Sequence, residues 1–148
     1  MLANQARRYR QIVERVEDLA RQPSREPSRI TDLCKIVGVS QRMLRSAFHQ
    51  VHGTAPYRYI RTLRMMQARR ALLSPPSCAV TVTQVATDCG FLELGRFSVE
   101  YRAAFGESPS ATLRHALTAG PVETERAEYR TRHIPGFHHE RDRHAAPA

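Results

Sequence analysis

The sequence is poor in lysine and, over a long interval, in acidic residues. Lys35 is the single lysine among 23 basic residues, and all the others are arginine. No aspartate or glutamate occurs between Asp32 and Asp88. The formal net charge is +9, and such an excess favours a polyanion or an anionic membrane surface as the partner.

Other absences narrow the class of protein. No run of about eighteen apolar residues is present, and the N-terminus lacks the apolar segment of a signal peptide, so we expect no membrane partner. Cys34, Cys78 and Cys89 are odd in number and share no CxxC spacing, which favours free or buried thiols in a reducing cytoplasm over a zinc site. No nucleophile can be grouped with a base and an orienting residue. We therefore expect no metal, no cofactor and no enzymatic activity.

The stretch from Val37 to Gln50 has the pattern of a helix-turn-helix. Gly38 suits the end of one helix, where a positive φ is needed, and Ser40 suits the N-cap of the next. Helical spacing then places the side chains on two faces: Leu44, Ala47 and Phe48 on one, and Gln41, Arg42, Arg45 and His49 on the other. Because arginine can donate two hydrogen bonds to guanine, the polar face suits a DNA major groove. Taken alone, this stretch fits an ordinary amphipathic helix with a solvated basic face equally well.

Helical spacing predicts further helices around this stretch. It predicts an amphipathic helix over residues 4–21, a short helix over 32–37 capped by Thr31, and a long helix from Pro56 to about Leu73. The long helix is expected to bury one stripe made of Ile60, Leu63, Ala68, Ala71 and Leu72. Its expected exposed side consists of Arg58, Arg61, Arg64, Arg69 and Arg70.

A second unit repeats the landmarks of the first. Thr83 precedes an expected short helix over 84–89, Gly90 ends it, and a further helix is expected over 94–105. The landmarks pair as Gly38 with Gly90, Phe48 with Tyr101, Gly53 with Gly106, Pro56 with Pro109, Ile60 with Leu113 and Arg61 with Arg114. The offset grows from 90 − 38 = 52 to 106 − 53 = 53, so the second turn holds one extra residue. A repeated helix-turn-helix is much more specific than either copy.

Together the two copies resemble the AraC/XylS family of bacterial transcription regulators. The matching segments include Ile30–Cys34, Val39–Leu44, Gly53–Pro56, Ala68–Leu73, Gly90–Phe91, Phe105–Pro109 and Leu113–Arg114. The resemblance implies an all-α domain of about seven helices over residues 12–116, preceded by an extension of the first helix over 1–11. Its first helix-turn-helix would span 31–51 and its second 83–105, joined by a linker helix over 56–73. The family arrangement also implies that the two recognition helices enter adjacent major-groove segments about 34 Å apart.

The resemblance assigns DNA contacts to both recognition helices. The expected DNA-binding residues are Ser40, Gln41, Arg42, Arg45, Ser46, His49, Leu94, Gly95, Arg96, Ser98 and Arg102. The second helix carries Glu93 and Glu100, and Leu92 stands where a capping serine or aspartate is expected. We therefore expect most direct base readout from Arg42, Arg45 and Gln41. We also expect the start of the second helix to fray more.

Several residues have a structural interpretation beside a functional one. Phe48, Met65, Met66, Phe97, Tyr101 and Phe105 are expected in or near the core rather than around a ligand. Residues 120–148 are polar, with arginines and four histidines, and are expected to be disordered. Metal capture by these histidines is the alternative to a solvated tail.

These observations predict a sequence-specific transcription regulator of the AraC/XylS type, acting as an activator in the cytoplasm at the bacterial nucleoid. The expected partners are double-stranded DNA and RNA polymerase, with no small-molecule effector bound by this chain. One alternative is a non-specific architectural protein that coats DNA through charge. A second is the isolated DNA-binding part of a larger ligand-responsive regulator, and a third is an adaptor that uses the helix over 56–73 to bind proteins.

Overall fold

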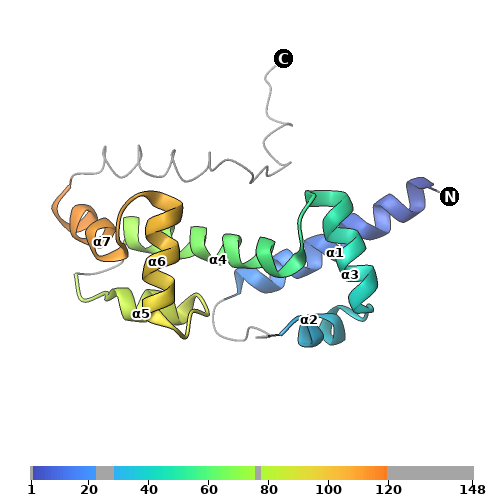
Figure 1. Cartoon of the computed structure of the whole chain (residues 1–148), viewed down its shortest axis with the longest axis horizontal. Helices are drawn as coiled ribbons and strands as arrows, with labels where there is room; N and C mark the ends of the chain where they lie inside the picture. Colours follow the sequence, from blue (N-terminus) through green and yellow to red (C-terminus); the bar gives the residue numbers. More distant parts are fainter. Residues whose placement is uncertain (1, 23–28, 76–77, 120–148) are drawn as a thin grey trace, which may run out of the picture.

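The computed structural model describes residues 2–22, 29–75 and 78–119, and this part of the chain forms helices and no strands (Figure 1). Its seven helices are α1 (Leu2–Arg21), α2 (Ile30–Val37), α3 (Gln41–His52), α4 (Pro56–Leu73), α5 (Val82–Asp88), α6 (Leu94–Phe105) and α7 (Pro109–Thr118). In Figure 1, α4 runs between α1–α3 at one end and α5–α7 at the other. The predicted all-α fold with two helix-turn-helix units and a long central helix is confirmed. The expected tail over 120–148 lies outside the described residues.

The first unit packs around side chains from α1, α3 and the first half of α4. Val13 and Val16 of α1 are almost completely buried. Phe48 of α3 is fully buried, and its ring centroid lies 5.5 Å from that of Tyr59 in an edge-on contact. Because Phe48 stands on the inner face of α3, this packing fixes the orientation of the outer face.

The second unit has its own core around α6. Phe97 and Tyr101 of α6 are fully buried, with their ring centroids 5.6 Å apart, and they pack with Ala68 and Leu72 of α4. The expected core placement of the aromatic and methionine side chains is confirmed: Phe48, Met65, Phe97 and Tyr101 are buried, and Met66 and Phe105 are half-buried.

α4 contributes to both cores because its buried side chains change sides along its length. Tyr59 and Leu63 pack into the first core, and Ala68 and Leu72 pack into the second. With about 3.6 residues per turn, these two pairs lie on opposite sides of the helix. The five residues expected on the buried side are buried or half-buried, but they divide between two sides of α4 and do not form one stripe. One continuous helix therefore sets the orientation of the two units relative to each other.

Arg69 was expected on the exposed side of α4, and this expectation is also wrong. Arg69 is 5% exposed, and its guanidinium lies 4.5 Å from the centroid of the Phe105 ring. Its Nη1 donates to Glu107 Oε1 at 3.2 Å, and the Thr112 hydroxyl donates to the same oxygen at 2.8 Å. Tyr101 in turn donates to Thr112 Oγ1 at 2.9 Å. Arg69 shares its side of α4 with Ala68 and Leu72, and the carboxylate of Glu107 offsets the cost of burying its charge.

The turn between α2 and α3 follows the predicted turn chemistry. Gly38 adopts φ 73°, the left-handed conformation that glycine accepts without strain. The Ser40 hydroxyl accepts a hydrogen bond from the Met43 N–H at 3.2 Å, as expected for an N-cap. The second turn is longer by one residue, since Gly38 precedes its N-cap by two positions and Gly90 precedes Glu93 by three.

The two short helices begin earlier than predicted. α2 begins at Ile30 after Arg29, so Thr31 lies inside the helix and is not its cap. α5 begins at Val82, and Thr81 rather than Thr83 is its N-cap, accepting from the Gln84 N–H at 3.2 Å. In this segment two threonines stand near the helix start, and the first one satisfies the free N–H.

A buried carboxylate joins α1 to the end of α3 and to α4. Glu17 is 4% exposed, and Tyr59 Oη donates to its Oε1 at 2.7 Å. His52 Nε2 lies 3.0 Å from the same oxygen, and Arg21 Nη2 donates to Oε2 at 3.1 Å. Burial raises the pKa of Glu17, but the hydrogen bonds from His52 and Tyr59, with the positive charges nearby, lower it to about 2.

This carboxylate makes stability depend on acid pH. Because the folded-state pKa of Glu17 is lowered, its contribution is present above the unfolded value of about 4.5 and is lost as pH falls toward about 2. We expect the free energy of unfolding to fall by about 2–3 kcal/mol more in the parent than in Glu17→Gln over that range. Urea unfolding of both proteins at several pH values measures this difference. Parallel curves for the two proteins would contradict the account.

Candidate nucleic-acid interface

The outer face of α3 carries the first set of expected DNA-contacting residues. Ser40, Gln41, Arg42, Arg45 and His49 are exposed, and Ser46 is half-buried. The inner face is held by Leu44, Ala47 and Phe48, all fully buried. A helix anchored this firmly on one side presents its guanidinium groups from a fixed backbone.

The outer face of α6 carries the second set. Leu94, Gly95, Arg96 and Arg102 are exposed, and Ser98 is half-buried. The N-cap is Glu93, not Leu92 as predicted, and its side chain makes no capping hydrogen bond. The start of α6 therefore lacks the cap that Ser40 gives α3, and for this reason we expect it to fray more.

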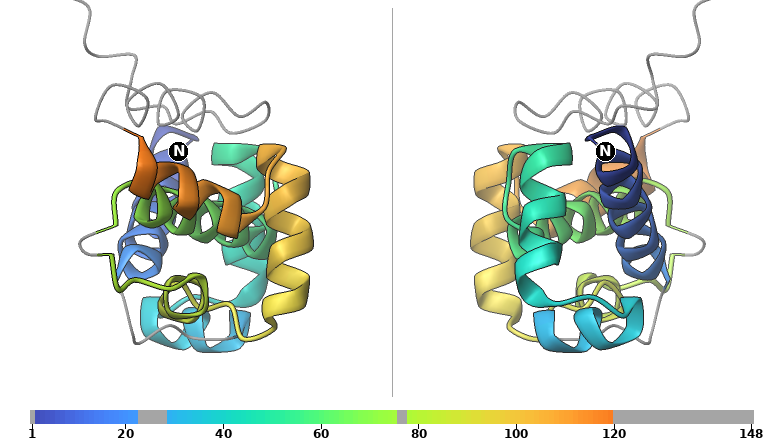
Figure 2. Two further views of the ribbon diagram at one scale, coloured as in Figure 1. Left: turned by 90° about the vertical axis from the view of Figure 1, so that its left-hand side faces the viewer. Right: turned by 90° about the vertical axis from the view of Figure 1, so that its right-hand side faces the viewer.

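Both recognition helices, α3 and α6, lie on the same side of the molecule. In the two end-on views of Figure 2, α3 and α6 are found together on one side of α4, and α1 is found on the other. In Figure 1 they stand at opposite ends of α4 and run in similar directions. A single partner molecule that lies along this side of the protein can therefore contact both helices at once.

The two recognition helices differ in how far their arginines are neutralised. Arg96 Nε donates to Glu100 Oε1 at 2.9 Å, and Arg61 Nε donates to Oε2 of the same carboxylate at 2.7 Å. These bonds lower the pKa of Glu100, chiefly through Arg61, so the carboxylate stays charged beside Arg96. No ion pair is found for Arg42 or Arg45 within the described residues. The same holds for Arg102 near the end of α6, so the difference lies between Arg96 at the start of α6 and the two arginines of α3.

Val99 is an outward residue of α6, as helical spacing predicts, but it is missing from the set of expected DNA-binding residues. It is 70% exposed on α6, and Leu92 before the helix is 83% exposed. The repeat offset of 53 places Val99 opposite Ser46 (99 − 53 = 46), at the middle of the outer face. The repeat itself therefore contained the signal that could have found this residue.

Metal ligands, membrane-spanning helices and cysteines are the other features of interest in residues 2–22, 29–75 and 78–119. These residues contain no group of three His, Cys, Asp or Glu side chains placed to hold a metal ion. None of their helices is long and apolar enough to cross a membrane. Cys34 is buried, Cys89 half-buried and Cys78 exposed, and none of the three forms a disulfide within the described residues.

Comparison with known proteins agrees with this geometry. The family model described as a helix-turn-helix domain matches residues 33–115. The crystal structure of "a probable AraC family transcriptional regulator" from Rhodopseudomonas palustris CGA009 is 34% identical, with a TM-score of 0.58, and covers 72% of this chain and 94% of that one. An AraC-type regulator structure from Chromobacterium violaceum is 29% identical with a TM-score of 0.57, covering 74% and 94%.

Relatives named after operons are also similar. The XylDLEGF operon transcriptional activator of Pseudomonas putida is 47% identical over 83 residues, which are 55% of this chain and 26% of the relative. The "Probable thc operon regulatory protein" of Rhodococcus erythropolis is 38% identical over 103 residues, 70% of this chain and 31% of the relative. The chain thus spans less than a third of these two relatives.

Two helix-turn-helix units on one bridging helix define a DNA-binding domain of the kind found in transcription regulators. The family match, the identity to the crystallised regulator and the shared fold assign the chain within that class. It belongs to the AraC/XylS family.

Proposed function

We propose that this chain is a sequence-specific transcription activator that inserts α3 and α6 into adjacent major-groove segments of a promoter. The observation that carries the proposal is that both recognition helices lie on one side of the molecule, fixed there by α4 (Figure 2). A single chain would then read an asymmetric site of two blocks about one DNA turn apart.

The roles of the expected residues follow from their chemistry. Arg42, Arg45 and Gln41 would meet base edges in the first block, each good bidentate contact contributing about 1–3 kcal/mol of discrimination. Arg96 would make one base contact in the second block, with Leu94 against a thymine methyl. The remaining residues would position the DNA backbone: Ser40, Ser46, His49, Gly95, Ser98 and Arg102.

Activation of transcription is supported by the names of relatives. Several similar proteins are called operon transcriptional activators. We infer that this chain acts in the cytoplasm, at the nucleoid, and brings RNA polymerase to its promoter. Transcription in vitro from a promoter with the selected site, with and without the chain, tests this step.

Selection from a random duplex library at about 150 mM salt, followed by fluorescence anisotropy, tests the sequence specificity. We expect an asymmetric site of two short blocks, bound about a thousandfold more tightly than random DNA. Recovery of no motif would contradict the proposal.

An apolar contact is expected from α6 in the second block. Val99 and Leu94 are exposed at 70% and 37%, and the C5 methyl group of thymine is the apolar feature of the major groove. Replacing each thymine of the second block by uracil should weaken binding by about threefold to fivefold at one position, the value of one buried methyl. Anisotropy titration measures the change, and Val99→Ser or Leu94→Ser should abolish it. An unchanged affinity with uracil at every position would contradict this contact.

A second candidate function is non-specific coating of DNA. It is favoured by the acid-free interval from residue 33 to 87, in which Arg42, Arg45, Arg58 and Arg70 are exposed. This candidate predicts that affinity falls steeply with salt and does not depend on sequence at any salt concentration.

A further inference from the structure

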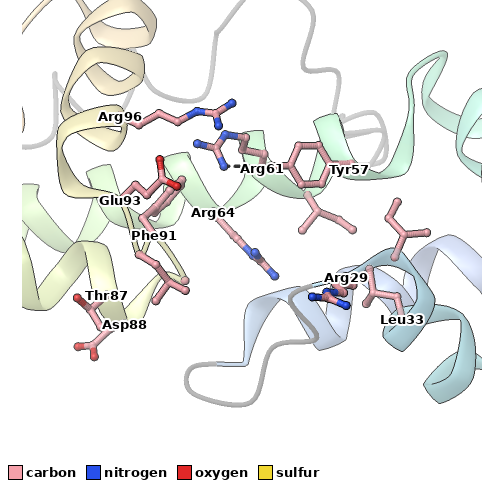
Figure 3. Close-up of a pocket in the computed structure, with 14 residues that line it drawn as sticks. Arg29, Leu33, Tyr57, Arg61, Arg64, Thr87, Asp88, Phe91, Glu93 and Arg96 are labelled. Carbon is pink, nitrogen blue, oxygen red and sulfur yellow. Dashed lines mark hydrogen bonds between the residues drawn. The ribbon is translucent and has the colours of Figure 1, made fainter.

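A groove of about 560 Å³ lies between the two helix-turn-helix units (Figure 3). Its sides are formed by the start of α2, by α4, and by the turn that connects α5 to α6. Leu33, Ile60 and Phe91 give it apolar walls. The functions assigned above to the two recognition helices do not use this groove.

The groove has an excess of positive charge. Its lining includes four arginines, Arg29, Arg61, Arg64 and Arg96, and only two acidic residues, Asp88 and Glu93. Arg61 and Arg96 both bind Glu100, which does not line the groove. Figure 3 shows Arg64 extending from α4 into the groove and Arg29 on the side formed by α2. These two arginines come from different elements and bring their charges to one hollow.

The groove is continuous with the recognition surface. Arg96, a recognition residue of α6, is also part of its lining, and Glu93 at the N-cap of α6 lines it as well. When α3 enters one major-groove segment of a duplex and α6 enters the next, the minor groove between these segments faces the protein. That segment, with its two phosphate strands, would face the middle of the protein, where the groove lies.

We propose that the groove receives the minor-groove edge of the spacer between the two blocks, and that Arg29 and Arg64 read the width of that groove. This inference rests on the proposed function. A·T-rich spacers have a narrow minor groove with a stronger negative potential, which attracts arginine. Guanidinium is less strongly hydrated than ammonium, so arginine enters such a groove more readily than lysine does. The protein would then prefer certain spacer sequences without touching a base edge in the major groove.

The test uses duplexes that share both selected blocks and differ in the spacer, which holds A·T, G·C or inosine·cytosine pairs. Inosine·cytosine resembles G·C in the major groove but lacks the guanine amino group of the minor groove. Anisotropy titrations compare the parent with Arg64→Lys, Arg29→Ala and the double variant Arg29→Ala/Arg64→Ala. Arg58→Ala and Arg70→Ala are matched controls, because both arginines are exposed on α4 and neither lines the groove. Circular dichroism checks that each variant is folded.

The parent is expected to bind the A·T and inosine·cytosine spacers about fivefold or more tightly than the G·C spacer. Arg64→Lys keeps the charge and should still lose most of this preference, and the double variant should lose it entirely while keeping its preference for the blocks. The control variants should keep both preferences. Equal affinity of the parent for all three spacers would overturn the inference, and so would a uniform loss in the double variant that leaves the spacer ratio unchanged.

A duplex with both blocks scrambled separates this inference from the proposed function. If scrambling has no effect on binding by the parent, the proposed function fails and this inference fails with it. If scrambling abolishes tight binding and the spacer has no effect, only this inference fails.

Discussion

Replacing Arg45 by alanine is expected to weaken binding to the selected site by about 10- to 100-fold, with specificity relaxed at one or two positions of the first block. Arg45 is exposed on the outer face of α3, so its loss should leave the fold unchanged. Arg96→Ala should have a smaller effect because Arg96 is already bound to Glu100 at 2.9 Å. Fluorescence anisotropy on the selected site and on single-base variants measures both.

Arg15→Ala is the control for this prediction, and Arg96→Ala provides its critical comparison. Arg15→Ala removes an exposed arginine from α1, which lies on the other side of α4, and should change affinity by less than about twofold at physiological salt. If Arg96→Ala relaxes specificity as much as Arg45→Ala does, the proposed division of work between α3 and α6 is wrong.

Replacing Phe48 by alanine is expected to lower the free energy of unfolding by about 3–5 kcal/mol. Phe48 is fully buried, and its ring packs against Tyr59 at 5.5 Å and His52 at 6.0 Å. The change would leave a cavity directly beneath the recognition face of α3. A loss of this size is a large part of the 5–15 kcal/mol that stabilises a domain of about this length.

Urea unfolding followed by circular dichroism measures the effect, and Phe48→Leu is the matched control. Because leucine fills most of the volume, the control should cost clearly less, about 1–1.5 kcal/mol. A loss below about 1 kcal/mol in Phe48→Ala would show that α3 is not anchored through this side chain.

The bounds of α3, α4 and α6 could be predicted because their ends carry strong local signals. Ser40, Gly53, Pro56 and Gly106 each suit one particular position at a helix end, and the structure uses them there. α2 and α5 were misplaced by two residues at their starts. Residue type favours Thr31 and Thr83 as their caps, but residue type does not show which free N–H needs a partner.

Other features depend on contacts between residues far apart in the sequence. The burial of Arg69 follows from its pairing with Glu107, 38 positions later, and from the change of buried side along α4. Periodicity could not reveal this change, because two short stripes on one helix resemble one broad stripe. The bond between Arg61 and Glu100, 39 positions apart, has the same character.

In the proposed interface, too, some features have a local sequence signal and others depend on contacts between distant residues. Arg96 and Glu100 are four residues apart on one helix, so their ion pair is predictable. The repeat pairs Val99 with Ser46 and could have identified Val99 as a further DNA-contacting residue. The placement of α3 and α6 on one side of the molecule could not be read from the residues themselves. It depends on how two separate cores use different sides of α4, and before the structure it rested on family resemblance alone.

We propose that one continuous helix, α4, holds the recognition helices α3 and α6 in phase with a single side of the DNA. Inserting about five base pairs between the two blocks, half a helical turn, moves the second block to the opposite side of the duplex. We predict that affinity then falls to that of DNA with only the first block, and that an insertion of about ten base pairs leaves it equally low because α4 cannot lengthen. Unchanged affinity after the half-turn insertion would contradict simultaneous reading by α3 and α6.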